Sequence, residues 1–100
     1  MIKKKERKLS SILAMDVVSY SSKMADDDEG TLKLLEERRV VIEKNIKMHG
    51  GRIFNTAGDA FMIDFSSPLE AVKAAIKIQK EIFNLNSNLT KEKQLEFRVG

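Results

Sequence analysis

Two aspartates occupy positions where a carboxylate can do chemistry. Asp16 interrupts the apolar run LSSILAMDVV at residues 9–18, and a carboxylate among apolar neighbours is costly to bury unless it is hydrogen-bonded, ion-paired or bound to a cation. Asp59 follows Gly58 in a two-residue connection between two short apolar runs, which is the pattern of a β-hairpin turn. Each aspartate also has an ordinary structural interpretation, because Asp16 can cap a turn at an exposed strand end and Gly-Asp is a common turn sequence.

The two carboxylates are more informative when they are considered together. If the strand at residues 9–18 neighbours the hairpin in one sheet, its C-terminal end and the hairpin tip meet at one edge and bring Asp16 beside Asp59. Like charges at close range disfavour joint ionisation unless cations lie between them. Carboxylate oxygens suit Mg²⁺ or Mn²⁺, and a pair of such ions can activate an attacking oxygen and stabilise a leaving one. The residues therefore predict a site for divalent metal.

The elements that must hold these aspartates follow from the pattern of apolar residues. The run 9–18 is rich in aliphatic and β-branched residues, which predicts a strand buried on both faces. The acidic stretch 26–29 is suited to cap a helix that begins near Glu29, runs to Met48 and ends at the glycine pair beyond it. His49, at that end, is expected to interact with the helix dipole rather than to act as a catalytic base. The predicted apolar stripe of this helix contains Leu32, Leu35, Ile42 and Ile46, flanked by Leu34 and Val41.

A second helix is predicted from Pro68 to about Leu85. Ser67, Pro68 and Glu70 match a helix start, with serine as the cap, proline at the first helical position and glutamate completing a capping box. One side of this helix is predicted to carry Val72, Ala75, Ile76, Gln79, Ile82 and Phe83.

Three further strands complete the predicted fold. Residues 52–57 and 60–65 form the hairpin, and the alternation of residues in the second run predicts one buried face. The run LEFRVG at 95–100 indicates a last strand. The resulting order is β-α-β-β-α-β, which predicts an α+β fold: a ferredoxin-like core with an antiparallel sheet covered on one face by two helices.

Composition bounds the kind of protein. A chain of 100 residues with 42% hydrophobic and 33% charged side chains has the values of one small globular domain. It has no cysteine and one histidine, which excludes disulfides, thiolate metal sites and most zinc sites and is compatible with a reducing cytoplasm. No apolar run approaches the length of a membrane span. We therefore expect a cytoplasmic protein without a transmembrane segment.

The net charge of +3 is concentrated at the N-terminus. Residues 1–8 hold five basic residues and one acidic residue, a charge of +4, which leaves −1 for residues 9–100. We therefore expect a basic, flexible tail at 1–8 ahead of one domain at 9–100, with weak attachment of the tail to an anionic membrane, nucleic acid or a partner as the alternative.

RNA recognition is the competing function for this order of elements. RNA-recognition domains share the β-α-β-β-α-β order and carry stacking aromatics on the third strand. When GDAFMIDF is aligned on Phe61, the other stacking positions fall on Asp59 and Asp64, where carboxylates would repel phosphate. We therefore expect no nucleic-acid partner.

From about Arg7 to Gly100, the chain resembles the N-terminal part of a bacterial class III adenylate/guanylate (nucleotidyl) cyclase catalytic domain. The resemblance is carried by AMDVVSYS before the acidic stretch and helix, by HGGRI at the helix end and by NTAGDAFMIDF as the metal-bearing hairpin. These pieces occur in order and with matching spacing, and they correspond to about the first half of the family's domain.

The resemblance implies specific roles for the residues already described. Asp16 and Asp59 would bind two Mg²⁺ or Mn²⁺ ions, with the backbone carbonyl of Val17 as a further ligand. In the family, the 3′-hydroxyl of ATP or GTP attacks its own α-phosphate and pyrophosphate leaves, so the implied product is a 3′,5′-cyclic nucleotide, with ATP as the expected substrate and GTP as the alternative. The turn whose backbone N–H groups hold the triphosphate corresponds to Val18, Ser19, Tyr20 and Ser21.

Two features depart from the family's pattern. Asn55, four residues before Asp59, stands where adenylate cyclases commonly place lysine and guanylate cyclases glutamate to read the purine, and an asparagine both donates and accepts. The family's transition-state asparagine and arginine correspond to positions beyond Gly100, and its domains pair head to tail. We therefore expect this chain alone to be inactive and to need a second cyclase domain; the alternative is a degenerate cyclase fold kept as a regulatory or dimerisation module.

Overall fold

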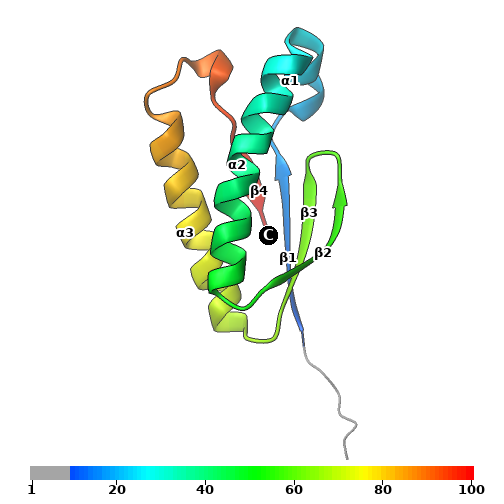
Figure 1. The fold of residues 1–100 in the computed structure, drawn as a ribbon, viewed down its shortest axis with the longest axis vertical. Coiled ribbons are helices and arrows are strands. Elements are labelled where there is room, and N and C mark those ends of the chain that lie inside the picture. The colour runs from blue at the N-terminus through cyan, green and yellow to red at the C-terminus, as the bar shows by residue number, and fades with distance from the viewer. Residues whose placement is uncertain (1–9) are drawn as a thin grey trace, which may run out of the picture.

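The computed structural model describes residues 10–100, which form a four-stranded antiparallel sheet with its helices on one face (Figure 1). The tail predicted for residues 1–8 lies outside the described residues. The strand order is β2-β3-β1-β4, so β1 is central and β4 lies at an edge. The elements are β1 (Ser11–Val17), α1 (Tyr20–Asp26), α2 (Asp28–Met48), β2 (Arg52–Ala57), β3 (Ala60–Phe65), α3 (Pro68–Asn86), the 3-10 turn η1 (Lys91–Lys93) and β4 (Phe97–Val99).

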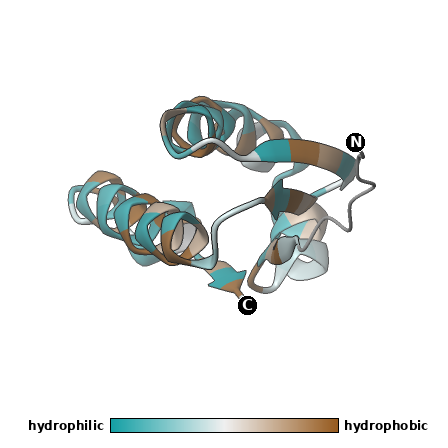
Figure 2. Cartoon of the chain, turned by 90° about the horizontal axis from the view of Figure 1, so that it is seen from below, coloured by the Kyte–Doolittle hydropathy of each residue, from teal (hydrophilic) through white to brown (hydrophobic). Residues whose placement is uncertain are grey.

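This arrangement confirms the predicted ferredoxin-like core. The two long helices, α2 and α3, pack against each other and against the sheet, and Figure 2 shows them from their ends as one layer beside the strands. Within residues 10–100, none of the helices combines the length and the hydrophobicity of a membrane span. The buried apolar residues lie between the helices and the sheet: Leu13, Met15, Val17, Leu35, Ile42, Ile46, Phe61, Ile63, Phe65, Ala71, Ala74, Ile78, Ile82, Leu95 and Phe97.

The prediction that β1 is buried on both faces is wrong. Leu13, Met15 and Val17 are buried, whereas Ile12 is 49% exposed and Ala14 is also exposed. Successive side chains of a strand point to opposite faces, and the helices cover only one face of this sheet. Every second residue of β1 therefore lies on an open face.

The start and end of α2 agree with the sequence prediction. The Asp27 side chain caps the helix by accepting a hydrogen bond from the Gly30 amide, at 3.0 Å from Oδ1. His49 is the C-cap residue, and Gly50 follows with a positive φ of 74°, a conformation that glycine adopts without a steric penalty. Leu35, Ile42 and Ile46 are buried as predicted, but Leu32 is 48% exposed, so its assignment to the core stripe is wrong.

The predicted serine cap and the proline at the start of α3 are confirmed, whereas the Glu70 carboxylate contacts His49 instead of completing a capping box. The predicted apolar side is right for Ile82, which is buried, and wrong for three other members. Ser67 Oγ accepts a hydrogen bond from the Glu70 amide at 3.2 Å, and Pro68 opens the helix. The side that packs on the sheet carries Ala71, Ala74, Ile78 and Ile82, because small alanines allow the helix backbone to lie close to the strands. Three members of the predicted stripe, Val72, Ile76 and Phe83, are between 55% and 72% exposed.

Helix α1 was not predicted from the sequence. It spans seven residues and buries none of them, so it has no apolar periodicity that a sequence pattern could show. It begins after Ser19, whose backbone is left-handed at φ 57°. This turn redirects the chain from the end of β1 into the helices.

A buried asparagine fixes the approach to β4. Asn86 Nδ2 donates to the Leu95 carbonyl at 2.7 Å, and its Oδ1 accepts from the Leu95 amide at 3.0 Å and from the Arg38 guanidinium at 3.3 Å. Both Asn86 and Arg38 are buried. One side chain thus joins α2, α3 and the segment that enters β4.

Replacing this asparagine should destabilise the whole domain. Asn86→Ala leaves the buried Leu95 amide and carbonyl and the Arg38 guanidinium without their partner, so we expect the free energy of unfolding in urea to fall by about 2–3 kcal/mol. Asn84→Ala, two residues earlier on the exposed side of the same helix, is the control and should change it by less than about 0.5 kcal/mol. Equal effects of the two substitutions would show that the Asn86 hydrogen bonds contribute nothing.

A second contact joins the end of α2 to the start of α3 and should make stability depend on pH. His49 Nδ1 lies 2.7 Å from Glu70 Oε1, and this hydrogen bond is the main cause that lowers the pKa of Glu70. Because the folded-state pKa lies below that of an unfolded chain, about 4.3, the ionised carboxylate stabilises the fold above that pH and loses this effect as the pH falls through the lowered value.

The variant Glu70→Gln lacks this acid-sensitive contribution. Between about pH 5 and pH 3, its urea midpoint should therefore fall less steeply than that of the wild type. Glu43→Gln, on the exposed side of α2, serves as the control and should follow the wild type. Parallel acid curves for wild type and Glu70→Gln would contradict a role for the His49 contact.

Candidate functional site

The two predicted site aspartates meet where the end of β1 lies beside the β2–β3 turn. Strands β1 and β3 pair antiparallel, with Met15 opposite Phe61. This pairing places the tip of the hairpin level with Asp16 and Val17. The neighbourhood expected from the sequence is therefore present in the fold.

Asp59 is hydrogen-bonded directly to the backbone of β1. Its Oδ2 accepts a hydrogen bond from the Val17 amide at 2.9 Å, which leaves Oδ1 for another partner. Gly58, directly before it, has a positive φ of 60° and makes the tight turn possible. In an extended strand the N–H and C=O of one residue point to the same side, so the Val17 carbonyl faces the hairpin as well.

Asp16 lies on the open face of the sheet, one residue before the end of β1. Its side chain is 42% exposed, and its backbone is paired with Arg98 on the edge strand β4. The Arg98 Nε donates to Asp16 Oδ1 at 2.8 Å. This hydrogen bond first, and then the negative charges of Asp16 and Asp59, raise the pKa of Arg98, so the guanidinium lies in the field of both carboxylates.

Arg98 is the site residue that sequence reasoning missed. The segment LEFRVG indicated a strand, but nothing in it fixed the register against residues 11–17. The observed register places Arg98 opposite Asp16, and directly opposed residues point to the same face of a sheet. A basic residue in the middle of a short apolar strand was the only available hint.

We call the place where Asp16, Val17 and Asp59 come together the metal corner of the sheet. The predicted triphosphate segment begins at this corner and continues into α1. The Val18 amide donates to the Glu96 carbonyl at 2.8 Å, and Ser19 is the N-cap residue of α1 without a side-chain hydrogen bond. Tyr20 and Ser21 form the first turn of α1, where backbone N–H groups have no partner within the helix. The Val18 amide is therefore already engaged in the sheet, contrary to the prediction that it holds a triphosphate, and the segment offers the helix-start amides that follow it.

Asn55 lies farther from the two aspartates. It is exposed on β2 next to a bulge in the pairing with β3, and it stands opposite Met62, which in turn stands opposite Ala14. These opposed residues share the open face with Asp16. Two strand spacings, about 10 Å, separate Asn55 from β1, so the structure places it on the same surface but not in contact with the carboxylates.

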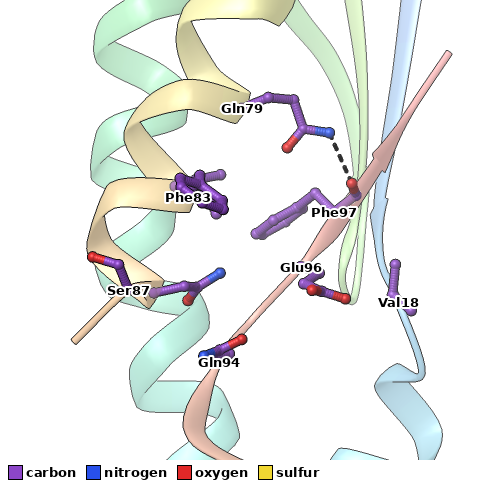
Figure 3. A pocket seen from close by; sticks show the side chains of 9 residues that line it. Val18, Gln79, Phe83, Ser87, Gln94, Glu96 and Phe97 are labelled. Carbon is purple, nitrogen blue, oxygen red and sulfur yellow. Dashed lines mark hydrogen bonds between the residues drawn. The ribbon is translucent and has the colours of Figure 1, made fainter. Parts of the chain in front are cut away.

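Two cavities border this corner on opposite faces of the sheet. On the open face, Asp16, Ala60, Met62 and Arg98 contribute to a shallow hollow of about 400 Å³. On the helix side, a cavity of about 420 Å³ lies between α3 and β4 (Figure 3). There Gln79 Nε2 donates to the Phe97 carbonyl at 2.9 Å and holds β4 against α3.

The donor set fits a divalent ion that is also held by its substrate. No cluster of three or more histidine, cysteine or acidic side chains occurs within residues 10–100, so the protein part of a site here consists of two carboxylates and a backbone carbonyl. These are hard oxygen donors, and Mg²⁺ is usually bound by one or two carboxylates together with substrate phosphates and water. Asp16, Val17 and Asp59 can therefore serve as a shared metal site.

Comparison with known proteins identifies the family. No family model matches the chain. A protein of Rhizobium meliloti (strain 1021) named "Putative adenylate cyclase 3" is 36% identical over 95 residues, which is 94% of this chain and 16% of that protein.

Solved structures extend this likeness to the fold. The adenylate/guanylate cyclase/hydrolase from Silicibacter pomeroyi is 32% identical, with a TM-score of 0.77 over 95% of this chain and 55% of its own. The guanylyl cyclase Cya2 is 25% identical, with a TM-score of 0.78 over 91% of this chain and 51% of its own. The chain thus spans about half of these solved structures and a smaller part of the Rhizobium protein. In sequence and in fold, the chain is part of a class III adenylate/guanylate cyclase catalytic domain.

Proposed function

We propose that this chain supplies the metal-binding part of a nucleotidyl cyclase site that converts ATP to its 3′,5′-cyclic nucleotide and pyrophosphate, with GTP as the alternative substrate. The observation that carries the proposal is the hydrogen bond that holds Asp59 against the Val17 amide, next to Asp16 at the end of β1. The relatives' names support the reaction class.

In this proposal the site residues have two tasks, metal binding and phosphate binding. Asp16, Asp59 and the Val17 carbonyl hold two Mg²⁺ or Mn²⁺ ions, and Asp59 is oriented for this by the Val17 amide. When bound, such ions lower the pKa of the attacking hydroxyl and neutralise the triphosphate. Arg98 adds a positive charge at the same corner, where a guanidinium matches phosphate geometry.

The nucleotide is proposed to extend from this corner in two directions. Its triphosphate lies toward the segment Val18–Ser21, where Ser19, Tyr20 and Ser21 offer their amides and the Val18 amide stays bonded to the Glu96 carbonyl. Its purine lies toward Asn55, which can donate to or accept from either base and has no charge with which to discriminate between them. The ATP preference therefore rests on the family likeness and not on a residue of the base site.

A second cyclase domain is proposed to complete the site. The described residues bring together carboxylates and one arginine, while the transition-state asparagine and arginine of the family correspond to later positions in its domain. A partner in head-to-tail arrangement would supply them. The second candidate function, a degenerate cyclase fold acting in regulation or dimerisation, is favoured by Asn55, because neither charged purine-reading residue of the family is present.

Binding of the metal-nucleotide complex tests the metal assignment. The 100-residue chain should bind Mn²⁺-ATP, and Asp16→Asn and Asp59→Asn should each weaken this binding at least about tenfold by isothermal titration calorimetry, because each removes a charged oxygen ligand. Asp64→Asn is the matched control: Asp64 is on the same open face and pairs with Arg52 at 3.4 Å, so its loss should leave binding unchanged. Equal affinities for wild type and Asp16→Asn would refute the assignment.

Turnover by the chain alone tests the need for a partner. Residues 1–100 with Mn²⁺-ATP should form no cyclic nucleotide above the background without protein, measured by chromatography, because only one side of the proposed site is present. Sustained turnover that disappears in Asp59→Asn would show that these residues suffice.

A further inference from the structure

Among residues 10–100, the contact between Arg98 and Asp16 is the closest ion pair on the open face of the sheet. Its 2.8 Å separation is shorter than the 3.4 Å of the Arg52–Asp64 pair on the same face. Arg98 donates through Nε to the carboxylate oxygen Oδ1, so the pair is a charge-assisted hydrogen bond. The proposed metal ligand Asp16 therefore already has a cation at one of its two oxygens.

The pairing of β1 with β4 places Arg98 beside Asp16. Asp16 and Arg98 are opposed residues of paired strands. The pairing is fixed on one side by reciprocal hydrogen bonds between Ala14 and Gly100, at 2.8 and 2.9 Å, and on the other by the Val18 amide and the Glu96 carbonyl. A cation that binds Asp16 consequently lies near the guanidinium.

We propose that Arg98 competes with divalent metal for Asp16, so that metal alone binds weakly and binds well together with an anionic substrate that takes up the released guanidinium. This inference rests on the proposed metal site. A positive charge a few ångströms from a divalent ion opposes its binding, and the Asp16 oxygen that accepts from Arg98 must be given up or shared. Phosphate oxygens offer a guanidinium an equivalent acceptor.

The test compares Mn²⁺ binding by wild type and Arg98→Gln, using the 100-residue chain at low ionic strength and the electron paramagnetic resonance signal of free Mn²⁺. Without nucleotide, Arg98→Gln should bind Mn²⁺ about tenfold more tightly than wild type. Arg98→Lys keeps the charge but loses the planar fork, and it should lie between the two. With a non-hydrolysable ATP analogue, which itself binds Mn²⁺, binding of the Mn²⁺-nucleotide complex is measured by isothermal titration calorimetry, and the advantage of Arg98→Gln should disappear.

Arg52→Gln is the matched control, because it removes the same charge from the same face. Asp64, the partner of Arg52, is opposed to Ile12, four residues before Asp16 on β1 and thus about 13 Å away. The Mn²⁺ affinity of Arg52→Gln should equal that of wild type. Thermal unfolding should confirm that all variants are folded.

The outcomes separate this inference from the metal assignment. The double variant Asp16→Asn/Arg98→Gln should lose the gain in affinity. In one outcome, Arg98→Gln binds Mn²⁺ no better than wild type while Asp16→Asn weakens Mn²⁺ binding in both the wild-type and the Arg98→Gln background. That result refutes competition by Arg98 and leaves the metal site standing. If Asp16→Asn has no effect in either background, or if Arg98→Gln shows no Mn²⁺ binding, the metal assignment fails and the inference fails with it.

Discussion

The hydrogen bond from the Val17 amide to Asp59 joins the central strand of the sheet to the tip of a hairpin that is 42 residues farther along the chain. This contact requires β1 and β3 to be neighbours, a turn of two residues and a glycine with positive φ directly before the aspartate. The helices cover only the other face of β1, so Asp16 beside this contact remains accessible. The layer structure of the domain and the chemistry of its corner therefore depend on the same pairing of strands.

Much of this fold could be predicted from local chemistry. The caps at Asp27 and Ser67 and the turn at Gly58 are short-range features, since each depends on residues within three positions along the chain. Which face of each helix is buried was harder to predict. Helix α3 carries two apolar stripes, and the stripe with Ala71 and Ala74 was buried because of packing distance, which a hydrophobicity pattern does not contain.

The same distinction applies to the site. An acid within an apolar strand and an acid in a tight turn drew attention to Asp16 and Asp59, and their meeting was predicted on the condition that the strand and the hairpin are neighbours in one sheet. The role of Arg98 depended on strand register, and register is set by long-range pairing that no residue of LEFRVG specifies by itself. The resemblance to class III cyclases supplied the proposed roles in metal, triphosphate and purine binding, which neither the residue types nor the strand pattern contained.

The side chain of Asn86 has a consequence for how sequence variants of such domains are interpreted. It lies in the interior on the far end of α3 and belongs to no proposed site, yet it holds the Leu95 backbone three residues before Arg98. A substitution that loosened this anchor without unfolding the domain would shift the edge strand and with it the only basic group that contacts Asp16 within the described residues. An apparently structural polymorphism in the helix layer can thus behave as a change of charge at the opposite face of the sheet.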